Sequence, residues 1–83
     1  MTAPRITAAM VSTVAEARSA VVVLDEAAGS LRLQPTLTAQ QADDPDVVVL
    51  LDHDAARYWL RARGTAGAAA AAATAEARLA VAA

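Results

Sequence analysis

The chain lacks cysteine entirely, and it also contains no lysine, asparagine or phenylalanine. Without cysteine it has neither a disulfide framework nor a thiolate metal site. Large apolar side chains are scarce, because 25 of the 83 residues are alanine, which adds more helix propensity than apolar area. A core built from this set is small. We therefore expect one small domain over residues 1–83 that forms a homo-oligomer or joins a larger protein assembly.

The chain also has no large net charge and no long hydrophobic run. The formal net charge of −2 gives no overall attraction to nucleic acid or to anionic lipid. The longest uncharged run, residues 64–75, is too short and too rich in alanine for a bilayer span of ~20 apolar residues. The run from Ile6 to Ala15 is interrupted by threonine and serine, which is untypical of a secretory signal. These features predict a cytoplasmic protein with no membrane partner.

What the chain does have is β-branched residues in two clusters, and the first predicts a hairpin. The run VVVL at 21–24 is followed by the polar turn DEAAGS and then by LRLQPTLT, in which leucines alternate with polar residues. Alternation of this kind, with Gly29 supplying a positive φ in the turn, predicts an antiparallel hairpin over about 20–38. Pro35 then belongs on an edge strand.

The second cluster repeats this order. The run VVVLL at 47–51 precedes DHDA and then RYWLRAR at 57–63, in which Tyr58, Leu60 and Ala62 alternate with Trp59 and the arginines. This alternation predicts a second antiparallel hairpin over about 47–63. Because the run 47–51 has no polar side, we expect a strand that is covered on both faces.

Helices are expected at both ends of the chain, which makes the predicted fold α+β. Residues 4–18 carry Ile6, Met10 and Val14 on one side, and residues 66–83 are rich in alanine. The C-terminal segment has little to bury, so it either packs its alanines closely against a neighbour or frays as a helical tail. The polar residues 38–46 are expected to form a surface connection.

An all-α protein of three helices is the alternative. Apolar residues recur at steps of three and four from Met10 to Leu24, and a further helix would begin at Asp44 and Pro45 and end at Gly64. In that fold Arg57 and Arg61 share one helical face, whereas Trp59 and Arg63 share another.

The candidate site depends on the choice between these folds. In a strand, alternate side chains project to one side, which places four residues together. They are Arg57, Trp59, Arg61 and Arg63. Tryptophan and arginine are enriched at protein interfaces, and the same pair suits phosphates and stacked bases. An outward strand face of arginine stems over an indole, without any ligand, is the plain structural alternative.

Other chemistry finds little support. Asp52-His53-Asp54 has no second histidine, cysteine or Glu-x-x-His spacing beside it, so a turn is expected in place of a metal site. The acidic residues Asp43, Asp44 and Asp46 lack the alternate ligand positions and the final glutamate of a calcium loop. With one histidine and no G-x-S-x-G, we expect no enzyme and no cofactor. The function expected is a non-enzymatic protein-interaction or assembly subunit, and the alternative is a small nucleic-acid-binding or regulatory module.

Overall fold

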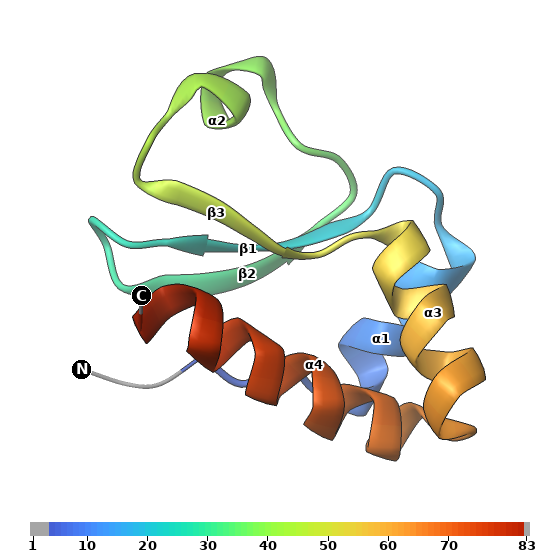
Figure 1. Cartoon of the computed structure of the whole chain (residues 1–83). Helices are drawn as coiled ribbons and strands as arrows, with labels where there is room; N and C mark the ends of the chain where they lie inside the picture. Colours follow the sequence, from blue (N-terminus) through green and yellow to red (C-terminus); the bar gives the residue numbers. More distant parts are fainter. Residues whose placement is uncertain (1–3, 83) are drawn as a thin grey trace.

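The computed structural model describes residues 4–82 and confirms the α+β class (Figure 1). Its elements follow one another in the order helix, two strands, helix, strand and two helices. They are α1 (Ala8–Glu16), β1 (Val21–Asp25), β2 (Ser30–Gln34), α2 (Ala39–Asp43), β3 (Val47–Leu51), α3 (His53–Arg63) and α4 (Ala66–Ala82). Within the described range no helix is both long and apolar enough to cross a membrane.

The first predicted hairpin is confirmed. Strands β1 and β2 pair antiparallel, with Val22 opposite Leu33 and Leu24 opposite Leu31. Gly29 adopts a φ of 67°, and its N–H donates to the carbonyl of Asp25 at 2.7 Å. A non-glycine residue rarely takes this left-handed conformation, so the glycine determines where the chain reverses.

Strand β3 corrects the expectation of a strand covered on both faces. The sheet order is β2-β1-β3, so β1 is central and β3 is an edge. In β1 the residues Val21–Leu24 are at most 8% exposed, whereas Val49 of β3 is 40% exposed. Both strands contain a continuous apolar run, so the run alone does not show which strand is central; the pairing partners decide that.

The second predicted hairpin is wrong, because residues 53–63 form helix α3. Asp52 caps its start by accepting the N–H of Ala55 at 2.8 Å, and Gly64 ends it with a φ of 87°. Arg61 and Arg63 lie in the last turn, where cations complement the helix dipole. These local caps, together with the burial of Ala56, outweigh the alternation that suggested a strand. The three-helix alternative was right that residues 53–63 are helical and that the helix ends at Gly64, but wrong to begin it at Asp44 and Pro45, since Val47–Leu51 form β3, and wrong about the sheet.

The other predicted segments agree with the structure in outline. Helix α1 begins later than expected, with Thr7 as its cap, and buries Val11 and Val14. The surface connection 38–46 contains the short helix α2, which starts with a capping box of Thr38 and Gln41. Gln41 also exchanges side-chain hydrogen bonds with Gln34 at the end of β2.

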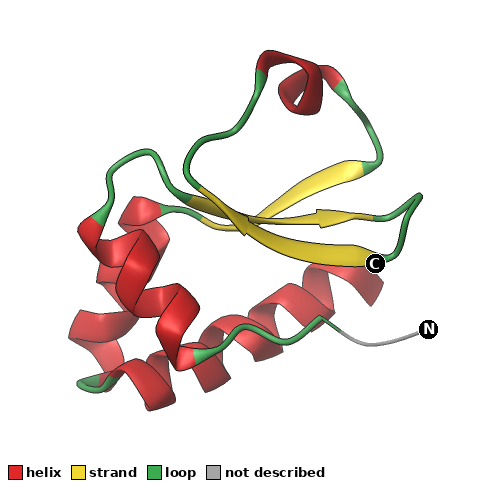
Figure 2. Cartoon of the chain, turned by 180° about the vertical axis from the view of Figure 1, so that it is seen from behind, coloured by secondary structure: helices red, strands yellow, loops and turns green. Residues whose placement is uncertain are grey.

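The core lies between the sheet and a layer made by α1, α3 and α4, whereas α2 lies on the other side of the sheet. Figure 2 shows the same layer from behind. Six of the eleven residues in the buried core cluster are alanines, and four of these belong to α4. They are Ala69, Ala70, Ala73 and Ala77, each at most 5% exposed. Helix α4 therefore packs by its alanine face and does not fray as a tail.

Ala69 on the buried face of α4 is fully enclosed, so a larger side chain there has to displace its neighbours. We predict that Ala69→Leu lowers the free energy of unfolding by about 1–3 kcal/mol, because Ala69 is completely buried. The matched control, Ala68→Leu, lies on the exposed side and should change it by less than about 0.5 kcal/mol. Urea unfolding followed by circular dichroism measures both. Equal stability of the two variants would contradict the packing of α4.

Candidate interaction surface on helix α3

Helix α3 has a buried side and an outward side. Ala56 is completely buried, and Trp59 and Leu60 pack against the core cluster as partly buried neighbours. The outward side carries Arg57, Tyr58 and Arg61, which are all exposed, and Tyr58 is 62% exposed. These three residues are hereafter called the α3 surface. They share one face of the helix because Arg61 follows Arg57 by four positions and Tyr58 by three.

The four residues of the predicted patch do not share one face. Arg57 and Arg61 point outward, whereas Trp59 is partly buried and Arg63 stacks over its ring with Cζ 5.6 Å from the centroid. The division is the one expected for a helix, so the single stripe of a strand is corrected here. Whether these residues contact a partner stays a prediction.

Trp59 stands at a junction of three elements. Its ring meets Tyr58 edge to face, with centroids 5.1 Å apart and an interplanar angle of 74°. Together with Leu50 of β3 and Ala77 of α4 it lines a small hollow of about 170 Å³. Trp59 therefore lies on the inward side of α3, where it packs against the core cluster.

The motif Asp52-His53-Asp54 serves the start of α3. Asp52 is the helix cap, and Nδ1 of His53 lies 3.1 Å from the carbonyl oxygen of Val14, within hydrogen-bonding distance. The motif lines a shallow hollow together with Arg18. No group of three or more potential metal ligands occurs among residues 4–82. The predicted turn at this motif is instead the first turn of a helix.

Asp43, Asp44 and Asp46 precede strand β3, so they lie at the opposite end of that strand from Asp52. Asp44 accepts the N–H of Asp46 at 2.9 Å and so shapes the turn between α2 and β3. Glu26, just after β1, donates its N–H to the carbonyl of Asp46 at 2.8 Å. The fold therefore adds Glu26 to the acidic group that the sequence shows as Asp43, Asp44 and Asp46.

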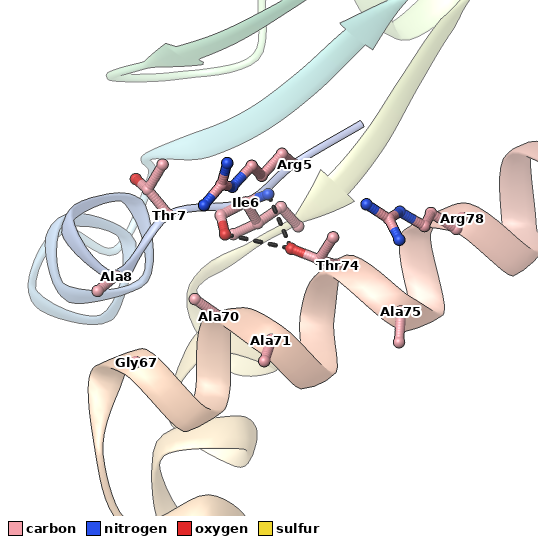
Figure 3. A pocket seen from close by; sticks show the side chains of 10 residues that line it. All are labelled: Arg5, Ile6, Thr7, Ala8, Gly67, Ala70, Ala71, Thr74, Ala75 and Arg78. Atoms are coloured by element: carbon pink, nitrogen blue, oxygen red, sulfur yellow. Dashed lines mark hydrogen bonds between the residues drawn. The ribbon is translucent and has the colours of Figure 1, made fainter. Parts of the chain in front are cut away.

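A groove of about 680 Å³ lies between the N-terminal segment and α4 (Figure 3). Alanines and Gly67 line much of it, and the guanidinium groups of Arg5 and Arg78 lie along it without any acidic lining residue. Thr74 joins its two walls, since its hydroxyl accepts the N–H of Ile6 at 2.9 Å and donates to the carbonyl of Ile6 at 3.1 Å. The groove has the charge to attract an anion, but its hydroxyl is already engaged within the fold.

The sequence did not lead us to expect Tyr58 at the surface, or Arg5 and Arg78 along the same groove. The signal for Tyr58 was present: an Asp cap at 52 and Gly64 bound a helix, and helical spacing places Tyr58 beside Arg57 and Arg61. The proximity of Arg5 and Arg78 has no local signal, because 73 positions separate them and only tertiary packing brings them together.

Comparisons with protein-family models, with curated proteins and with solved structures found no match to this chain. The candidate site therefore stands on its geometry alone.

Trp59 and the arginine that stacks over it, Arg63, differ in what they contribute to stability. We predict that Trp59→Ala lowers the free energy of unfolding by about 2–3 kcal/mol, since a large partly buried ring is lost from the junction. Arg63→Ala should lower it by less than about 1 kcal/mol, the range of an exposed cation–π contact. Arg61→Ala is the control, because Arg61 stacks on no aromatic ring among residues 4–82. Denaturant unfolding measures all three, and a neutral Trp59→Ala would refute the anchoring role.

Proposed function

We propose that the chain is a non-enzymatic protein-interaction subunit that self-associates through the α3 surface. The observation that carries this proposal is the exposure of Tyr58 between two exposed arginines on a helix whose opposite side is held in the core. Tyrosine and arginine are the residue types most enriched where a few side chains dominate binding energy. The proposal keeps the cytoplasmic location expected from the sequence.

The rigidity of α3 supports this function. Caps at Asp52 and Gly64 define both ends of the helix, and Ala56, Trp59 and Leu60 pack its inward side into the core. Side chains on a fixed helix lose less conformational freedom on binding than side chains on a loop, which favours recognition. A small core, built largely from alanine, also benefits from the extra apolar area that association buries.

Binding of nucleic acid is the second candidate. One observation favours it: three of the seven arginines lie on the eleven residues of α3. Guanidinium groups pair with phosphate oxygens, and Tyr58 offers a ring on which a base can stack. Against it stands the net charge of −2, which opposes approach to a polyanion.

Sedimentation velocity over a range of protein concentrations tests the proposal. We predict that the wild-type chain self-associates, and that Tyr58→Ala together with Arg57→Ala reduces the association constant by about tenfold or more. The control, Arg18→Ala with Arg32→Ala, removes two exposed arginines elsewhere and should leave association nearly unchanged.

A second arm adds a mixed single-stranded oligonucleotide. A wild-type chain that stays monomeric alone and sediments faster only with the oligonucleotide would support the second candidate and overturn self-association.

A further inference from the structure

The charges of this chain are separated along the sequence although its net charge is small. Residues 19–56 hold seven acidic side chains and one arginine, whereas residues 57–83 hold four arginines and one glutamate. A net charge of −2 therefore conceals a strongly negative middle segment and a positive C-terminal segment. Such a distribution produces an oriented field that acts on other charged surfaces.

The fold gathers part of the negative charge at one place. Glu26, Asp43, Asp44 and Asp46, hereafter the acidic corner, are all exposed. The turn after α2 and the end of β1 meet there through the hydrogen bond from Glu26 N–H to the carbonyl of Asp46. Pro45, also exposed, gives the corner a small apolar surface between two aspartates.

The acidic corner and the α3 surface lie at opposite ends of the molecule. In Figure 1 the hairpin tip after β1 and the start of β3 are at the left, whereas α3 is at the right. The view from behind shows the same separation (Figure 2). The chain measures 33 × 26 × 17 Å along its principal axes, so the two surfaces cannot pair within one copy.

The two surfaces match in pattern as well as in charge. The α3 surface has an exposed tyrosine beside two exposed arginines, and the acidic corner has an exposed proline between Asp44 and Asp46 in the sequence. Asp54 is also exposed at the N-terminal end of α3, so an acidic partner is repelled there and attracted to the turn that holds Arg57 and Arg61.

We propose that the occupant of the α3 surface is the acidic corner of a second copy of this chain, so that copies associate head to tail. This inference rests on the proposed function and names its partner surface. The contact is heterologous, so every assembly keeps one unused α3 surface at one end and one unused acidic corner at the other, and growth continues unless the rotation closes a ring. Exposed ion pairs are weak individually, so association is expected to depend steeply on protein concentration and on salt.

Reversing the charge of the α3 surface and cancelling that of the acidic corner, in separate variants, test the proposal. One variant carries Arg57→Glu and Arg61→Glu, and a second carries Asp43→Arg and Asp46→Arg. Asp44 is left unchanged because its carboxylate shapes the turn. The control carries Arg5→Glu and Arg78→Glu, which change the net charge as much as the first variant but lie in the groove. Circular dichroism verifies that each variant is folded.

The expected result, measured by sedimentation velocity at about 50 mM salt, is that each of the first two variants alone loses association by about tenfold or more, whereas the control behaves as wild type. An equimolar mixture of the two variants should form a complex of one copy of each, because the unchanged α3 surface of the second variant and the unchanged acidic corner of the first still make the wild-type junction. About 500 mM salt should weaken wild-type association.

Three outcomes separate the inference from the proposed function. If the α3 variant fails to associate but the acidic-corner variant associates as wild type, the head-to-tail inference is overturned and the α3 surface keeps its role. If the α3 variant associates as wild type, the proposed function is overturned with it. A wild-type chain that is monomeric at every concentration overturns both.

Discussion

The close packing of the alanine face of α4 is the constraint on which the rest of the structure depends. Ala69, Ala70, Ala73 and Ala77 are buried against a layer that also contains Val11 and Val14 of α1 and Ala56 of α3. Small side chains bring helices close together, so dispersion contacts between backbones replace the apolar area that larger residues would supply. The resulting core is compact and small, and only the inward side of α3 packs into it.

From that constraint follows the surface that the protein presents. With α1, α3 and α4 gathered on one side of a three-stranded sheet, the outward side of α3 is left exposed by the residues 4–82 that the structure describes. Tyr58 is exposed there for this reason, while Trp59, one residue further, is turned toward β3 and α4. The same sheet places the acidic corner at the far end, so the geometry that anchors α3 also separates the two charged surfaces.

The segment 53–63 shows where prediction from the sequence failed. Its residues alternate as in a strand, yet they also carry an N-cap at Asp52, arginines in the last turn and a glycine at 64. Both patterns are local, and they predict different elements for the same residues. What decided for the helix is that Ala56 and Leu60, one turn apart, meet the core cluster on one side. The predicted patch of Arg57, Trp59, Arg61 and Arg63 was divided for the same reason, because a helix places them on two faces.

By itself the sequence determined the α+β class, the first hairpin with its reversal at Gly29, and a helical C-terminal segment. These features depend on short-range preferences: β-branched runs, a glycine that tolerates positive φ, and the helix propensity of alanine. Only the tertiary structure decided that β1 is central and β3 an edge, that Arg5 and Arg78 line one groove, and that Glu26 joins the aspartates of residues 43–46. Each of these relations joins residues far apart in the chain, and their pairing is set by the packing of all the elements together and not by any local pattern.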